Sequence, residues 1–170
     1  RITQNGTINW IPLPTQVDNY SFGVEVSDGF ASSKLQYNVY INAPPVISSR
    51  PSEHFFLTLG DSLYFPLESF DMNMNAKLNW GLNLGPVDMF LDSAGVLKWQ
   101  GDILDHHPYE IQLSDGIDST IWNGSIYVNA LPIITSNPIT FISENELYEY
   151  QLDSWDENLI SPLDPHTDNK

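Results

Sequence analysis

The sequence predicts an all-β protein made of tandem Greek-key β-sandwiches with about seven strands each. Three observations support this prediction. Residues 109–138 are a second copy of residues 20–51, because the Ser-Asp-Gly and Asn-Ala landmarks of both copies are separated by 87 residues. Apolar and polar residues alternate with a period of two inside both copies. Turn-forming residues interrupt the short apolar runs, and no long stretch has helical periodicity.

Each copy is predicted to form a β-hairpin that closes one unit. Its first strand alternates apolar and polar residues from Tyr20 in the first copy and from Tyr109 in the second. An Asp-Gly pair then follows, at Asp28 and at Asp115, and such a pair supplies the positive φ of a tight turn. A second alternating strand and a short Pro-containing joint complete the pattern.

The repeat divides the chain into three parts. Residues 1–42 are expected to be the C-terminal half of one unit, with strands at 6–10, 20–26 and 35–41. Residues 43–130 are expected to be a complete unit. Its predicted strands are 55–59, 62–67, 78–82, two strands within 89–99, and the hairpin from residue 109.

The last part, residues 131–170, is expected to be the N-terminal half of a further unit. The run from Pro132 repeats the run from Pro45, and residues 147–152 and 154–158 repeat residues 63–67 and 69–73. Because the chain starts inside a repeat, we expect it to be a piece of a longer protein.

The composition of the chain excludes some classes of binding partner. The 22 acidic and 6 basic residues give a net charge of −16, which disfavours nucleic acid and anionic lipid surfaces and favours cations. No apolar run reaches the length of a membrane-spanning helix. The chain has no cysteine, which excludes disulfides and thiolate metal sites without excluding an extracellular location.

With these residues assembled, the chain resembles the cadherin-like superfamily, and within it the dystroglycan-type cadherin-like, or Ig-like, repeats of large surface proteins. The resemblance covers nearly the whole chain, and no single motif is specific. Its ordered motifs are Pro132-Ile133-Ile134, Tyr148-Glu149-Tyr150, Asp71-Met72-Asn73, Pro86 with Leu91-Asp92, Gly95 with Trp99, and Tyr109 with Ser114-Asp115-Gly116.

The resemblance implies a non-catalytic structural or adhesive segment of a secreted or cell-surface protein. The expected partners are neighbouring repeats, other copies of the protein, surface proteins or glycans. The alternative interpretation is a carbohydrate-binding accessory module of a larger secreted enzyme. Trp10 and Trp99 occupy equivalent positions and are expected in the core. The alternative for them is an exposed aromatic platform for sugar, to which Trp80, Trp122 and Trp155 could also belong.

The resemblance also implies Ca²⁺ as a ligand of carboxylate and amide oxygens. The candidate ligands are Asp28, Asp71, Asn73, Asp105, Asp115, Glu144 and Asp156. The linkers carry Ala and Pro where the metal-binding members carry acidic residues, so a three-ion junction is not expected. The other interpretation is that these Asp and Asn residues bond to their own backbone in turns.

Three further hypotheses come from the residues themselves. Asn5 and Asn123 begin glycosylation sequons. The adjacent His106 and His107 would point to opposite faces of a strand, and no catalytic motif is present. The incomplete ends could complete each other between two chains, head to tail, and build a filament, or a longer array could be represented only in part.

Overall fold

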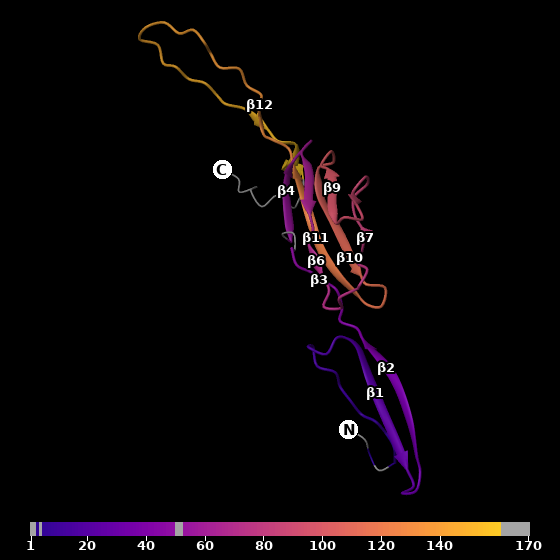
Figure 1. Cartoon of the computed structure of the whole chain (residues 1–170). Helices are drawn as coiled ribbons and strands as arrows, with labels where there is room; N and C mark the ends of the chain where they lie inside the picture. The colour runs from indigo at the N-terminus through magenta and orange to yellow at the C-terminus, as the bar shows by residue number, and fades with distance from the viewer. Residues whose placement is uncertain (1–2, 4, 50–52, 161–170) are drawn as a thin grey trace.

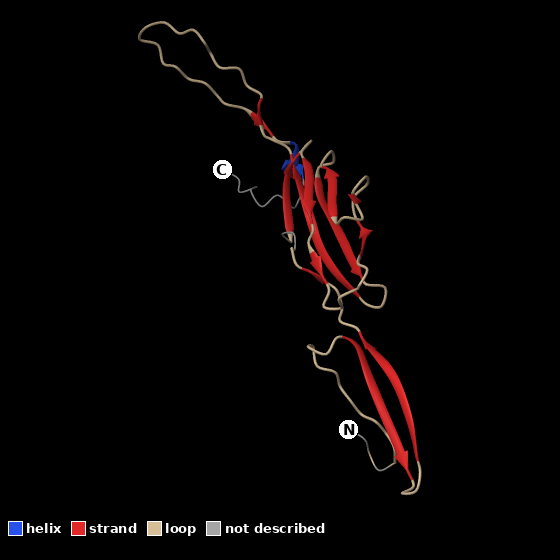
Figure 2. Cartoon of the chain, viewed as in Figure 1, coloured by secondary structure: helices blue, strands red, loops and turns tan. Residues whose placement is uncertain are grey.

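The computed structural model describes residues 3, 5–49 and 53–160 and contains strands, turns and one short 3-10 helix, which confirms the all-β prediction. A central sandwich lies between an N-terminal hairpin and an extended C-terminal limb (Figure 1). Figure 2 shows that long strands make up the sandwich and the hairpin, whereas the limb is mostly loop. Among the described residues, no helix has the length and apolarity needed to cross a membrane.

The central unit consists of two main sheets and a two-stranded accessory sheet. The first sheet has the order β4 (His54–Thr58), β11 (Ser119–Asn129), β10 (Asp105–Ser114) and β7 (Asn79–Leu84). Strand β4 runs parallel to β11, and the other pairs are antiparallel. The second sheet has the order β5 (Ser62–Pro66), β9 (Val96–Gln100) and β8 (Phe90–Leu91), and β3 (Val46–Ile47) pairs with β6 (Ser69–Phe70). The unit thus has nine strand segments, three of them with only two residues, where about seven were expected.

The core lies between the two main sheets. Alternation places every second residue of β10 inward, so Tyr109, Ile111 and Leu113 are buried while their neighbours are more exposed. They join Leu97 of β9 and Ile126 of β11 in one apolar cluster. These residues belong to both sheets, so neither sheet can bury its apolar face without the other.

The N-terminal segment repeats the last hairpin of the central unit. Strands β1 (Asp18–Ser27) and β2 (Ser32–Ile41) form a sheet of their own, and Asp18 pairs with Ile41 as Asp105 pairs with Val128. The residues of the second pair follow those of the first by 87 positions. The strand expected at residues 6–10 is reduced to a single bridge at Ile8.

Trp10 nevertheless keeps its predicted place. Its ring lies 5.7 Å from that of Tyr20, and the ring of Trp99 lies 5.0 Å from that of His107, the equivalent pair of the central unit. Trp99 is buried in the core and Trp10 is half-buried. The two tryptophans therefore mark the same position in two related units.

The C-terminal limb repeats the start of the central unit. Strands β12 (Ile133–Ile134) and β13 (Ser154–Trp155) pair as β3 and β6 do, and the helix η1 (Glu157–Ile160) follows. Residues 147–152 repeat residues 63–67 of the predicted strand 62–67, so a strand was expected here too; this expectation is wrong, since the segment forms no ladder. Its counterpart β5 pairs with β9, and within the described residues the limb has no equivalent of β9 beside it.

Candidate functional site

The junction between the hairpin and the central unit is organised by one buried amide. Asn73 is 2% exposed, and its Oδ1 accepts a hydrogen bond from the backbone N–H of Ala43 at 2.8 Å. Its Nδ2 donates to the carbonyl of Ile41 at 2.8 Å and to Oδ1 of Asp18 at 3.1 Å. Oδ1 of Asp71 accepts from the N–H of Asn73 at 2.7 Å and fixes the loop. One side chain therefore connects the linker, the base of β1 and the loop after β6, an arrangement that we term the Asn clamp.

A second amide of this junction engages two carboxylates. Nδ2 of Asn42 donates to Oδ2 of Asp115 at 2.8 Å and to Oδ2 of Asp118 at 3.0 Å. Desolvation opposes ionisation of Asp115, but the N–H of Ile117 and the Asn42 amide outweigh it and lower the pKa of this carboxyl. The turn between β10 and β11 is thereby held against the linker by charge-assisted hydrogen bonds.

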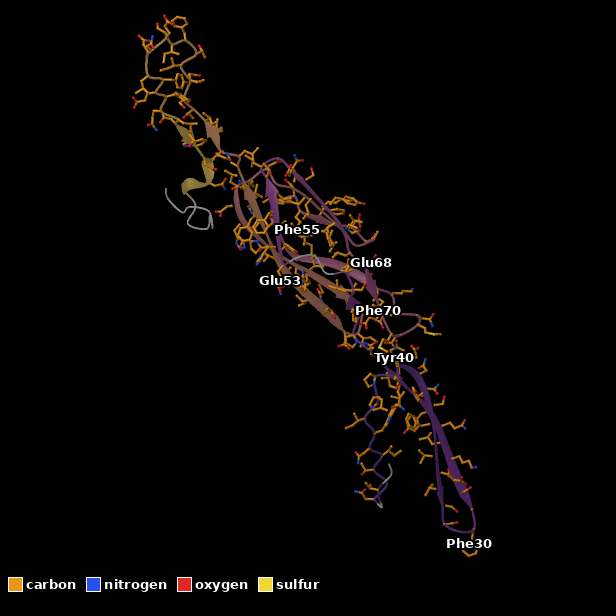
Figure 3. The ribbon with its side chains drawn as sticks, turned by 90° about the vertical axis from the view of Figure 1, so that its left-hand side faces the viewer. Phe30, Tyr40, Glu53, Phe55, Glu68 and Phe70 are labelled. Atoms are coloured by element: carbon orange, nitrogen blue, oxygen red, sulfur yellow. The ribbon has the colours of Figure 1, made fainter. Side chains whose placement is uncertain are left out.

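The junction is strongly acidic. Desolvation, followed by the negative charges of Asp18, Asp71 and Asp115, raises the pKa of Tyr40. Tyr40 lies where the hairpin meets the central unit, and Phe30 lies at the opposite tip of the hairpin (Figure 3). Oδ2 of Asp71 is buried and accepts no hydrogen bond from the residues that the structure describes, so one carboxylate oxygen has unused bonding capacity.

The second junction repeats the Asn clamp. Oδ1 of Asn158 accepts from the N–H of Ala130 at 2.5 Å, and its Nδ2 donates to the carbonyl of Val128 at 3.4 Å. Oδ1 of Asp156 accepts from the N–H of Asn158 at 2.9 Å. Asn158 is buried like Asn73. The two asparagines are aligned in the sequence, where Asn73 was predicted as a candidate Ca²⁺ ligand and Asn158 was given no role; their hydrogen bonds to the linkers were not predicted.

The Ser-Asp-Gly turns are also alike in detail. Oδ1 of Asp28 accepts from the N–H groups two and three residues ahead at 2.8 Å each, and Oδ1 of Asp115 does the same at 2.7 Å. Gly29 and Gly116 both have φ of 91°, a conformation that favours glycine. The backbone N–H of Ala31 is the main cause that lowers the pKa of Asp28. Both aspartates therefore bond to their own turns, and only Asp115 also lies at a junction.

The structure gathers only part of the predicted calcium set. Asp71, Asn73 and Asp115 meet at the first junction, and Asp156 lies in the equivalent loop of the second. Asp28 lies in the turn between β1 and β2, Glu144 is exposed in the limb, and Asp105 begins β10 with φ of 107°. Within residues 3, 5–49 and 53–160, no three Asp, Glu or His side chains are arranged to hold a metal ion.

Sequence analysis missed Asp18 and Asp118, two carboxylates of the first junction. Asp18 could have been found from the sequence, because it precedes the candidate ligand Asp105 by the repeat offset of 87 residues. The structure supports this equivalence, since both residues have a positive φ, which is 74° at Asp18. Asp118 has no counterpart in the earlier turn, where Ala31 stands. A hard cation would still find carboxylate oxygens at this junction, but Asp115 and Asp118 would have to exchange their bonds to Asn42 for it.

Aromatic side chains gather on the outer face of the first sheet. The rings of Phe56 and Tyr127 stack at 5.3 Å, and those of His54 and His106 approach Tyr127 at 5.6 and 4.7 Å. Phe56 is exposed. His107 lies instead against Trp99 on the inner face, as its adjacent position predicts. We refer to Phe56, Tyr127, His54 and His106 as the aromatic cluster.

The tryptophans considered for a sugar platform do not form one. Trp80 and Trp122 are half-buried and pack against the core, and only Trp155 is exposed. Both glycosylation candidates are exposed. Asn123 lies on β11, and Oδ1 of Asn5 accepts hydrogen bonds from the hydroxyls of Thr3 and Thr7.

The strand order defines the class of protein. One sheet pairs β7, β10 and β11, and the other pairs β5, β9 and β8, as the C-F-G and B-E-D strands pair in immunoglobulin-type sandwiches. The chain therefore contains an Ig-like β-sandwich. No protein-family model matches the chain, and no curated protein matches it.

Several solved structures are similar in shape. Sidekick-1 immunoglobulin domains 1–5 align over 75% of this chain and 29% of their own, with 15% identity and a TM-score of 0.47. The insect immune protein hemolin aligns over 65% and 29%, with 14% identity and a TM-score of 0.41. An endo-fucoidan hydrolase of glycoside hydrolase family 107 aligns over 71% and 20%, with 24% identity and a TM-score of 0.39. The chain thus spans less than a third of the length of each of these proteins.

Proposed function

We propose that the chain is a structural or adhesive segment of an extracellular repeat protein, in which clamped junctions hold successive sandwiches in a fixed orientation. The observation that carries this proposal is the repeated clamp. Asn73 and Asn158 are equivalent and buried. Asn73 bonds the backbone on both sides of Asn42, at Ile41 and Ala43, and Asn158 does the same around Asn129, at Val128 and Ala130. A flexible tether would need no buried amide, because burying a polar group is unfavourable unless its hydrogen bonds are satisfied.

The composition of the chain is compatible with a location outside the cell. The absence of cysteine makes the fold independent of the redox state of its surroundings, and the net charge of −16 favours solubility. We assign it no catalytic activity. Neighbouring repeats and other copies of the same protein are the partners that this proposal requires.

Distance measurements between two spin labels test the stiffness of the first junction. The cysteine-free chain permits clean labelling of Ser32→Cys on the hairpin and Ser93→Cys on the central unit, both exposed. We expect one narrow distance distribution, which broadens in the Asn73→Ala background. The exposed Asn75→Ala serves as the matched control and should leave the distribution unchanged. A broad distribution in the unmodified background would refute the fixed orientation.

Calcium enters the proposal as an added ligand of the first junction. The buried, unpartnered Oδ2 of Asp71 and the nearby charges of Asp18 and Asp115 support binding there. The hydrogen bonds of the Asn clamp involve only protein groups, so calcium would add stiffness to a junction that these bonds already hold. A single weak site is the most that these residues supply.

The second candidate function is carbohydrate binding, and the aromatic cluster is the observation that favours it. Exposed rings stack against the apolar faces of sugars, and the imidazoles of His54 and His106 add hydrogen-bonding groups. Glycan-array binding that is lost in Phe56→Ala and retained in Phe30→Ala would favour this function. Phe30 is a suitable control because it is exposed at the far tip of the hairpin.

A further inference from the structure

The central unit carries exposed aromatic rings on the outer faces of both main sheets, and the two faces differ in charge. On the second sheet, Tyr64 and Phe90 are 66% and 57% exposed, and both lie opposite Lys98 of β9. The ammonium group of Lys98 lies 5.7 Å from the centroid of the Tyr64 ring and 3.1 Å from Oδ2 of Asp92. The chain therefore places a cation of its own on this aromatic surface.

The aromatic cluster lies on a sheet whose strands contain no such cation. Strands β4, β7, β10 and β11 have no lysine or arginine, and their carboxylates are those of Asp105 and Glu110. Phe56 of this cluster is 73% exposed, although its ring also stacks on Tyr127. Arg50, the basic residue closest to Phe56 along the chain, lies outside the described residues. The strands of the first sheet thus combine exposed rings with negative charge.

One of these carboxylates points to the same side as the aromatic cluster. Tyr109 of β10 is buried in the core, and alternation therefore turns both His106 and Glu110 to the outer face. Oε1 of Glu110 accepts a hydrogen bond from Nδ2 of Asn83 at 2.9 Å, which holds the carboxylate there. His106 and Glu110 are separated along β10 by roughly 13 Å. A ligand that contacts the rings and this carboxylate together must therefore be longer than a single sugar unit.

We propose that the aromatic cluster binds glycans built of cationic amino sugars. A sugar unit lies with its apolar face against the exposed ring of Phe56, and the positive group of that unit is attracted by the ring electrons. Further units extend along β10 towards Glu110, whose carboxylate pairs with a second positive group. This inference rests on the second candidate function and names the charge class of its ligand.

The charges of the molecule select a cationic glycan over neutral and anionic ones. The net charge of −16 attracts positive ligands at long range and repels uronic and sulfated glycans. At contact, a cation over an exposed ring corresponds to about a two- to fivefold gain in affinity over a neutral sugar of the same shape. The second sheet is not an equivalent site, because Lys98 already lies over Tyr64 and would repel a second cation.

Two tetrasaccharides with the same β-linked backbone test the charge class by isothermal titration calorimetry. The first carries a trimethylammonium group on every unit, a charge that does not depend on pH, and the second carries a neutral acetamide at the same position. Acetylated tetralysine, with the same number of positive groups, tests whether a basic protein segment is the preferred partner. Each titration is repeated at high salt, where the long-range attraction is screened.

Three single substitutions locate the binding site. Phe56→Ala removes the exposed ring, and Phe90→Ala is its matched control because Phe90 is exposed on the other sheet. Glu110→Gln removes the negative charge and keeps an oxygen that can accept from Asn83. Thermal unfolding checks that each variant is folded.

The expected result is a preference for charge that depends on the aromatic cluster. At high salt the cationic tetrasaccharide should bind the unmodified chain about two- to fivefold more tightly than the acetylated one. Phe56→Ala should remove this preference, Glu110→Gln should reduce it, and Phe90→Ala should leave it unchanged. Tetralysine should bind more weakly than the cationic tetrasaccharide, because it has no sugar face to lie against the ring of Phe56.

Four results would overturn the inference. Equal or tighter binding of the acetylated tetrasaccharide, lost in Phe56→Ala, would retain the second candidate function and refute the cationic class. No binding of either tetrasaccharide would refute both. Cationic binding that is unchanged in Phe56→Ala would assign the attraction to the overall charge of the chain. Tetralysine that binds as tightly, with the same dependence on Phe56, would identify a basic protein segment as the partner instead.

Discussion

Replacing Asn73 by aspartate tests the Asn clamp with almost no change of shape. The new carboxylate still accepts from the N–H of Ala43, but it can no longer donate to Ile41 or Asp18. It also places a negative charge next to two acceptor oxygens. Asn75→Asp makes the same chemical change two residues later at an exposed position, and it is the matched control.

The magnitude follows from the bonds that are lost. Two donated hydrogen bonds contribute about 0.5–1.5 kcal/mol each, and two acceptors left facing a buried charge add a penalty of similar size, so we expect a loss of about 3 kcal/mol. For a unit of this size that loss lowers the melting temperature by about 12–24 °C. The neighbouring carboxylates should raise the pKa of the introduced group, so acidification through that pKa should restore part of the loss.

Thermal unfolding and amide hydrogen exchange provide the readouts. Exchange at the N–H of Ala43 reports the clamp directly, because that proton is donated to Asn73. It should be much faster in Asn73→Ala, which removes the acceptor, than in the unmodified chain. Equal melting temperatures for Asn73→Asp and Asn75→Asp, together with unchanged exchange at the N–H of Ala43 in Asn73→Ala, would refute the role of the clamp.

Three further predictions follow from particular contacts. Calcium at about ten times its dissociation constant should raise stability by about 1.4 kcal/mol, measured as a shift in melting temperature, and Asp71→Asn should abolish the shift; no shift would exclude the calcium site. Gly124→Ala should destabilise the central unit by about 1–3 kcal/mol in urea unfolding, because the added Cβ would overlap the ring of Tyr109, and an unchanged midpoint would contradict this packing. The N–H of Val96, and then the ammonium group of Lys98, lower the pKa of Asp92. The stability that this carboxylate contributes is therefore present above its unfolded pKa and is lost as the pH falls through its folded pKa. Asp92→Asn should lose less melting temperature in acid than the unmodified chain does, and an equal loss in both would contradict this contribution of Asp92.

The repeat made much of the fold predictable. Alternation identified the strands of both hairpins because side chains of a strand point alternately to two faces, and the Asp-Gly pairs located their turns. The equivalence of Trp10 and Trp99 followed from sequence spacing alone. Prediction failed at residues 147–152, where the apolar pattern is present but no partner strand lies beside it. A strand is defined by its neighbour as much as by its own residues, and one sequence does not state whether the neighbour is present.

The candidate site was less predictable than the fold. The sequence by itself determined that Asp71, Asn73 and Asp115 recur in polar loops, because loop chemistry is local. Only the tertiary structure decided that the amide of Asn73 bonds the linker, and that Asp18 and Asn42 meet the loops from a separate hairpin. These contacts join residues that are 30 to 73 positions apart, and their formation depends on how two folded units are placed against each other. Local sequence patterns encode strands and turns, whereas the packing of whole units selects which polar groups become buried partners.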